Sequence, residues 1–219
     1  MGVRRDKRKR KRKVSRKVQT GSKSWPERTD ASILTEAEFL EQKREGSWHV
    51  IGVMGFAGSW RHTGLSGEEL DEYKHNMKAA LGSVILAEKA WWDDALVVSS
   101  GATDYGVLQL TYELCTETKI RALGVAAAQS LNHPIARLDL VIPVGHKFGD
   151  ESNVFLQTAD AFVLLGGGMQ SKAEVLRAHE MKKPVTILQG FGGVADELTP
   201  DDLPDAVFLD ARRPSDWQV

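Results

Sequence analysis

The feature that most constrains the fold is an apolar run that ends in three glycines. Ala161–Leu165 forms the run, Gly166, Gly167 and Gly168 follow it, and a helical pattern begins directly afterwards. The run predicts a buried strand, and the glycines let the backbone turn sharply into a helix. Such a turn presents free N–H groups at the positive end of a helix dipole, where an anion such as phosphate can bind.

Two more apolar runs have glycine-bearing turns at their ends. Gly55 and Gly58 follow the run that starts at His49, and the segment Gly101–Gly106 follows the run Ala95–Val98. In parallel α/β sheets the turns at the carboxyl ends of the strands meet at one edge, where nucleotides bind. We therefore predict that the three turns gather at one edge and form a nucleotide site.

Short apolar runs alternate with helical patterns along most of the chain. Strands are predicted at 48–54, 95–99, 120–125, 138–144, 161–165, 185–188 and 206–209, and helices at 67–90, 105–118, 153–158 and 171–182. This alternation predicts an α/β fold, a doubly wound, Rossmann-like and mostly parallel sheet with helices on both faces.

Charge is distributed unevenly along the 219 residues. The segment 4–17 is strongly basic, and without residues 1–17 the chain has 18 basic and 29 acidic residues. We predict a basic, disordered arm at 1–30, a linker at 31–46 with a possible short helix, and one Rossmann-like nucleotide-binding domain at 47–219.

Two interpretations of the arm remain open. It is a solvated extension of little consequence, or residues 4–17 contact nucleic acid or an import receptor. The sequence contains neither a secretory signal nor a run of about 18 apolar residues, so we expect a soluble, intracellular protein without a membrane partner. Its expected location is the cytoplasm, or the nucleus if the arm is an import signal.

The lone cysteine and a tryptophan pair are interpreted structurally. Cys115 excludes an intrachain disulfide, and its apolar helical neighbours predict a buried side chain. No metal-ligand spacing is present, so we expect no metal ion and no required cofactor. Trp91 and Trp92 are expected in the core or in a subunit contact of a homodimer or higher oligomer.

The segment 159–174 resembles the second signature of the LOG-like proteins, formerly called lysine decarboxylase-like, in the SLOG superfamily of Rossmann-like nucleotide-binding domains. That signature runs Pro-Gly-Gly-x-Gly-Thr-x-x-Glu after an Asp-Ala strand. Gly167, Gly168, Ser171 and Glu174 fall on the Gly, Gly, Thr and Glu positions of that signature, whereas Gly166 replaces its Pro and Gln170 replaces its third Gly.

The turn 101–108 is similar to the family's earlier Gly-Gly-Gly-x-x-Gly-Leu-Met motif. Gly101 and Gly106 are kept, whereas Ala102 and Thr103 depart from it. Together the two motifs place the resemblance over about residues 48–210.

The resemblance implies a nucleotide or ADP-ribose-like ligand. In the family's cytokinin-activating enzymes it implies a phosphoribohydrolase that cleaves the N-glycosidic bond of a nucleoside monophosphate, with Glu174 as the catalytic carboxylate. The position of the family's catalytic Arg is taken by Glu151, which inverts the local charge. His146, Lys147 or Arg61 would then have to supply a cation.

Three functions stay open: a nucleotide-binding or sensory domain, a hydrolase with a rearranged site, and an accessory protein tethered to nucleic acid by its arm. The Ser171-x-x-Glu174 pattern has a structural alternative, because it is also typical of a helix capping box. Besides Glu174, the predicted ligand-binding residues are Gly55, Gly58, Ser59, Gly101, Thr103, Gly106, Gly166, Gly167, Gly168, Gln170 and Ser171.

Overall fold

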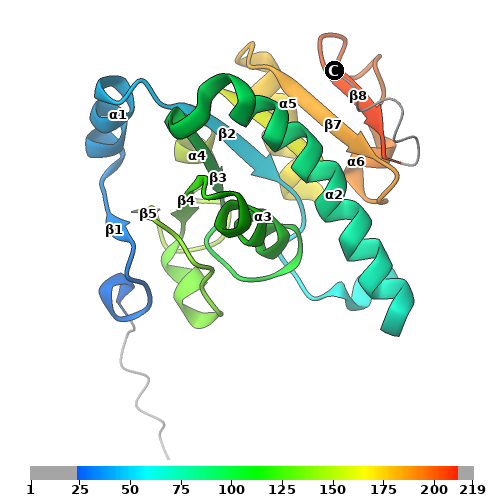
Figure 1. Ribbon diagram of the computed structural model, residues 1–219, viewed down its shortest axis with the longest axis horizontal. Coiled ribbons are helices and arrows are strands. Elements are labelled where there is room, and N and C mark those ends of the chain that lie inside the picture. The colour runs from blue at the N-terminus through cyan, green and yellow to red at the C-terminus, as the bar shows by residue number, and fades with distance from the viewer. Residues whose placement is uncertain (1–23, 212–219) are drawn as a thin grey trace, which may run out of the picture.

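The structure, a computed structural model, describes residues 24–211 and is built around one eight-stranded sheet (Figure 1). The strand order is β1-β5-β4-β3-β2-β6-β7-β8, and every neighbouring pair is parallel. The strands are β1 (Ser32–Ile33), β2 (His49–Met54), β3 (Leu96–Ser100), β4 (Arg121–Ala126), β5 (Leu140–Pro143), β6 (Ala161–Leu165), β7 (Val185–Gln189) and β8 (Val207–Asp210).

Helices cover both faces of the sheet, as predicted for a doubly wound fold. The α-helices are α1 (Glu36–Glu45), α2 (Gly67–Trp92), α3 (Gly106–Thr118), α4 (Ser152–Thr158), α5 (Met169–Glu180) and α6 (Val194–Glu197). Short 3-10 helices are η1 (Trp25–Glu27), η2 (Trp60–Thr63), η3 (Asp93–Ala95) and η4 (Ala128–Asn132).

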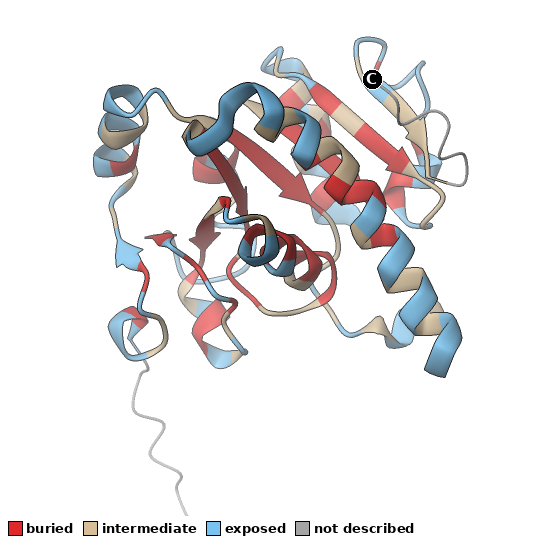
Figure 2. Cartoon of the chain, in the orientation of Figure 1, coloured by how far each residue is buried: buried red, intermediate tan, exposed pale blue. Residues whose placement is uncertain are grey.

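Alternate residues of each strand point to opposite faces, and this separates two apolar clusters. In β2, Ile51 and Val53 pack in the cluster that contains α2 and α3, whereas Val50 and Met54 pack in the cluster that contains α1, α4, α5 and α6. Figure 2 shows the central strands as almost wholly buried. The near-continuous apolar runs in the sequence follow from this burial on both faces.

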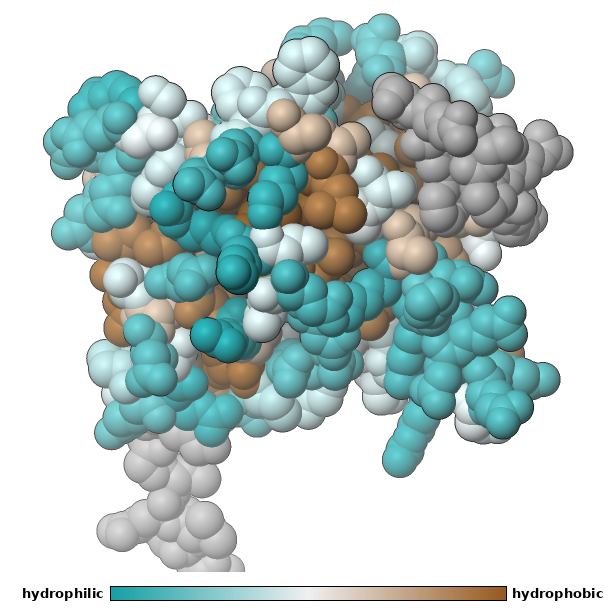
Figure 3. All heavy atoms as spheres, in the orientation of Figure 1, coloured by the Kyte–Doolittle hydropathy of each residue, from teal (hydrophilic) through white to brown (hydrophobic). Residues whose placement is uncertain are grey.

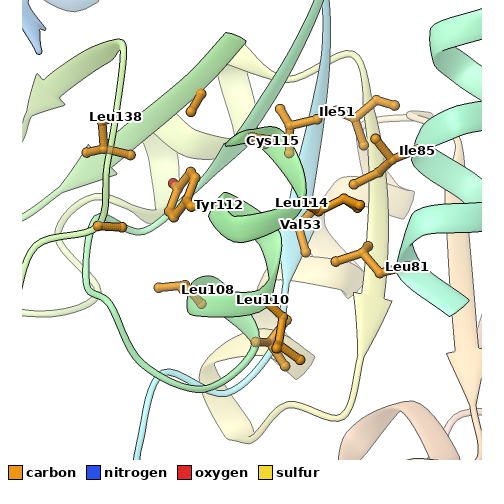
Figure 4. Close-up of a cluster of buried hydrophobic side chains, with 14 of the residues drawn as sticks. Ile51, Val53, Leu81, Ile85, Leu108, Leu110, Tyr112, Leu114, Cys115 and Leu138 are labelled. Atoms are coloured by element: carbon orange, nitrogen blue, oxygen red, sulfur yellow. The ribbon is translucent and has the colours of Figure 1, made fainter. Parts of the chain in front are cut away.

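Cys115 belongs to α3 and lies in the same apolar cluster as Leu114 and Ile51 (Figure 4). The thiol is buried, and burial raises its pKa to about 12. It therefore stays protonated at neutral pH and fills space in the core, as the sequence predicts.

The segment before the Rossmann-like core packs on the sheet. Strand β1 pairs with β5 at the sheet edge, and the short helix expected within 31–46 is α1. Trp25 is 7% exposed, and the guanidinium of Arg28 donates a hydrogen bond to the carbonyl oxygen of His133 at 2.6 Å. Residues 24–46 thus add an edge strand and a helix where we predict the end of the arm and a linker, and the basic segment 4–17 lies outside the described residues.

The two tryptophans at the end of α2 do not enter the core. Trp91 is 87% exposed and Trp92 is 42% exposed, with the ring of Trp92 stacked on His49 at 4.3 Å between centroids. Hydrophilic residues cover the opposite end of α2 in Figure 3.

None of the helices in residues 24–211 is both long enough and apolar enough to span a membrane.

We predict that Gly106→Ala lowers the free energy of unfolding by about 1–3 kcal/mol, the usual cost of a non-glycine residue in a strained backbone region. Gly106 has a φ of +56°, and a Cβ there would lie 2.3 Å from the carbonyl oxygen of Phe56. Chemical denaturation measures the change. The matched control is Gly82→Ala inside α2, where the nearest side-chain atom lies at 3.6 Å, and we expect no loss there. Equal stability of the Gly106 variant and the wild type would contradict the account.

Candidate ligand-binding site

A cleft of about 390 Å³ opens at the carboxyl edge of the sheet. It lies where the order reverses, because β2 pairs with β3 on one side and with β6 on the other. Doubly wound folds bind their ligands at this switch point. The lining residues are Val53, Met54, Gly55, Phe56, Ala57, Ser100, Gly101, Ala102, Thr103, Leu108, Val125, Ser130, Phe148, Glu151, Phe155, Gly168, Met169, Gln170, Ser171 and Glu174.

The turn after β2 holds the other two predicted turns in place. The backbone N–H of Val107 donates to the carbonyl oxygen of Phe56 at 3.0 Å, which fixes the start of α3. The hydroxyl of Ser171 donates to the carbonyl oxygen of Gly55 at 3.2 Å, which fixes the start of α5. The three glycine turns therefore lie together, as the sequence predicts. Gly106 does not line the cleft, since its role is the close approach to Phe56.

The turn after β6 needs glycine at two positions. Gly166 and Gly167 have φ values of +61° and +88°. The chain then becomes extended at Gly168, the N-cap of α5. Within residues 24–211, the backbone N–H groups of Met169, Gln170 and Ser171 have no acceptor, as is normal for the first turn of a helix. These N–H groups and the helix dipole form an electropositive point on the rim of the cleft.

Gly168 differs from its neighbours because nothing in the fold requires a glycine there. Its φ is −126°, a value that any residue adopts, and a Cβ would have no atom within 4 Å. It is exposed and lines the cleft. Glycine at this position keeps the cleft open in front of the α5 N–H groups.

Two carboxylates stand in the cleft. Glu174 accepts hydrogen bonds from the hydroxyl of Ser152 at 2.5 Å and from the side-chain amide of Gln170 at 3.0 Å. Glu151, which precedes α4, accepts one from the backbone N–H of Gly149 at 2.9 Å. Burial, with a smaller contribution from the negative charge of Glu174, raises the pKa of Glu151.

The capping-box interpretation of Ser171 and Glu174 is wrong. Helix α5 starts at Met169 with Gly168 as its N-cap, three residues earlier than a box with Ser171 as N-cap requires. Ser171 therefore lies inside the first turn and donates to Gly55, while Glu174 faces Ser152 and Gln170 in the cleft. The extended backbone of Gly168 makes the earlier start possible.

The remaining predicted residues spread over two neighbouring hollows. Gly58 and Ser59 line one of about 290 Å³ that shares Thr103 and Phe148 with the cleft. Gly166 and Gly167 line another that is described below.

None of the candidate cations lies in the lining of the cleft. The backbone N–H groups of His146 and Lys147 both donate to Asp150 in an exposed loop, and Arg61 is exposed in η2. The residues that line the cleft include no Lys, Arg or His. Among residues 24–211, no three His, Cys, Asp or Glu side chains are grouped so as to hold a metal ion.

The sequence reasoning missed the aromatic walls and a fourth glycine turn. Phe148 and Phe155 line the cleft, although the pattern gave no sign that they would reach it. Gly190, Gly192 and Gly193 follow β7. The sequence pattern that predicts the other three turns, an apolar run that ends in glycines, is present here too and could have predicted this turn.

Comparison with known protein families agrees with this geometry. Residues 49–212 match the model of the SLOG cluster4 family. The chain belongs to this family. The match spans the sheet from β2 to β8 and all of the residues around the cleft. The predicted membership of the SLOG superfamily is therefore confirmed.

Several solved structures with low sequence identity share the fold of this SLOG cluster4 protein. The X-ray structure of TM1055 has a TM-score of 0.54 at 23% identity and covers 75% of this chain and 88% of its own. The molybdenum cofactor binding protein of the phototrophic bacterium Rippkaea orientalis has a TM-score of 0.56 at 19% identity, covering 77% and 92%. The molybdenum cofactor carrier protein of Chlamydomonas reinhardtii has a TM-score of 0.53 at 19% identity, covering 75% and 92%. A search of the curated proteins found no match.

We predict that Glu151→Gln stabilises the protein at about pH 7 and has little effect at about pH 4, near the ordinary pKa of Glu. A carboxyl whose pKa is raised in the folded state favours folding at low pH, and this contribution is lost as the pH rises through the folded pKa. Glutamine stays neutral at every pH, so the variant does not lose this stability as the pH rises. Thermal unfolding of both proteins across this pH range measures the difference.

The control for this prediction is Glu72→Gln on the exposed surface of α2, which removes one negative charge away from the cleft. A Glu151→Gln variant that is less stable than the wild type at neutral pH would show that the charged carboxylate of Glu151 does not destabilise the fold.

Proposed function

We propose that this chain binds a nucleotide or nucleotide-derived ligand in the cleft and acts as a binding or sensory domain. The observation that carries the proposal is the start of α5, where residues with free backbone N–H groups line the cleft next to Gly168, a glycine that the fold does not require. A phosphate group accepts hydrogen bonds from such N–H groups and is favoured by the helix dipole.

The rest of the cleft suits the nucleoside part of such a ligand. Phe56, Phe148 and Phe155 supply apolar walls, and about 390 Å³ is in the range of ordinary small-molecule sites. Glu151 and Glu174 accept hydrogen bonds, so they favour ribose hydroxyl or base amino groups. These carboxylates would repel a phosphate, which restricts the anion to the α5 rim.

The names of the structural neighbours support a small-molecule ligand. Two of them are named for binding or carrying the molybdenum cofactor. Identities of 19% support the shared fold alone, so the names support a ligand of small-molecule size and not that particular cofactor. The shared feature on which the proposal draws is the Rossmann-like fold.

Hydrolysis of a nucleoside monophosphate has less support in the geometry. Such a reaction uses a carboxylate and a cation that stabilises charge in the transition state. Glu174 is available, but the lining of the cleft includes no Lys, Arg or His, and the resemblance to the family's motifs puts Glu151 where the family has its Arg. Binding without turnover fits this charge distribution better.

The proposal predicts that Gly168→Asp weakens nucleotide binding by about tenfold or more relative to Gly168→Asn, because like charges placed together cost several kcal/mol. Asp and Asn cap helices about equally well and have the same shape, so the pair isolates the charge. Thermal shifts with nucleoside mono-, di- and triphosphates and ADP-ribose provide the measurement.

A bound ligand at about 100 times its Kd adds about 2.7 kcal/mol to stability, which such assays detect. Equal affinities of the Asp and Asn variants would place the phosphate away from α5. If no nucleotide stabilises the wild type, the proposed function is wrong. Release of free base from a nucleoside monophosphate by the wild type, lost in Glu174→Gln, would favour the hydrolase instead.

A further inference from the structure

A second hollow of about 590 Å³ adjoins the cleft on the other side of Phe56. The two share Phe56 and Gly168 in their linings. The second hollow extends to the glycine turn after β7, which includes Gly190 and Gly192. We call it the second compartment. The shared residue Gly168 is the N-cap of α5, so both hollows border the proposed phosphate site.

The walls of the second compartment are aromatic. The ring of His62 lies 4.1 Å from that of Phe56, and the ring of Tyr73 lies 5.8 Å from that of Phe191, both pairs edge to face. The hydroxyl of Tyr73 donates to the carbonyl oxygen of Phe191 at 2.6 Å, which holds the glycine turn. Burial, together with the charge of Asp196, raises the pKa of Tyr73, so its phenol stays neutral.

The glycine turn of this compartment is not a phosphate site, in contrast to the start of α5. Asp196 already accepts the backbone N–H of Gly190 at 2.6 Å and that of Gly192 at 3.0 Å. Beyond Gly193, the backbone N–H of Val194 donates to the carbonyl oxygen of Gly167, and that of Ala195 donates to the carbonyl oxygen of Gly166. A phosphate here would have to displace a carboxylate from these groups.

The charges of the lining lead to the same conclusion. The residues that line the second compartment include no Lys, Arg, Asp or Glu, and His62 is their one titratable group besides Tyr73. Aromatic walls without a Lys, Arg, Asp or Glu among the lining residues favour a flat, uncharged ring, since rings stack or meet edge to face there.

We infer that the second compartment binds a second aromatic ring of the same ligand, so that the ligand is of the dinucleotide class. One nucleoside occupies the cleft, the linking phosphates pass Gly168 at the start of α5, and the second base lies among Phe56, Tyr73 and Phe191. This inference rests on the proposed function, because it extends the ligand from the site proposed there.

The test compares three kinds of ligand by isothermal titration calorimetry: adenosine and guanosine 5′-monophosphates, ADP-ribose, and the symmetrical diadenosine and diguanosine 5′-diphosphates. In the wild type we expect a dinucleoside diphosphate to bind about tenfold or more tightly than its monophosphate and than ADP-ribose, given the usual strength of base–aromatic stacking. Phe191→Leu removes the ring and keeps the backbone carbonyl that Tyr73 contacts.

We expect Phe191→Leu, and the exposed second variant His62→Ala, to lose most of this advantage and to keep monophosphate affinity. Trp91→Leu is the control, because this exposed aromatic residue lines neither hollow. If the wild type binds mono- and dinucleotides equally well, the inference is wrong and the proposed function stands. If Phe191→Leu and His62→Ala both keep the full advantage, the second base lies elsewhere. If none of these ligands binds, both are wrong.

Discussion

The geometry of the site depends on the turn that follows the central strand β2. Its two carbonyl oxygens hold both flanking helices, since Phe56 accepts the N–H of Val107 at the start of α3 and Gly55 accepts the hydroxyl of Ser171 at the start of α5. The first contact is possible only because Gly106 has no side chain and a φ of +56°. Parallel pairing of β2 with both β3 and β6 brings the three turns within reach of one another.

Most of the sheet could be predicted from the sequence because its strands are buried on both faces and leave continuous apolar runs. Strand β1 was missed for the opposite reason, since Ser32 and Ile33 are both exposed at the sheet edge. The position of the site was predictable from glycines at strand ends. The roles of the individual glycines could not be predicted from the sequence. Only the folded backbone shows that Gly106 is needed for packing, whereas packing does not require a glycine at position 168.

The misread helix start has a clear physical cause. The Ser171-x-x-Glu174 pattern is compatible with a cap, and the sequence does not reveal that Gly168 is extended and serves as the N-cap. Because the N-cap is Gly168, three residues before Ser171, Glu174 is not part of a cap and lies in the cleft beside Ser152. The same limitation hid the aromatic walls, because Phe148 and Phe191 come from loops whose course depends on tertiary contacts.

The central claim is that a phosphate binds at the first turn of α5, and amide chemical shifts test it most directly. When a nucleoside diphosphate is titrated into the ¹⁵N-labelled protein, we expect the largest shifts at the backbone N–H groups of Met169, Gln170 and Ser171. The N–H groups of Gly190 and Gly192 should change little, because Asp196 already holds them. Shifts that leave residues 169–171 unchanged, whatever else moves, would contradict the account.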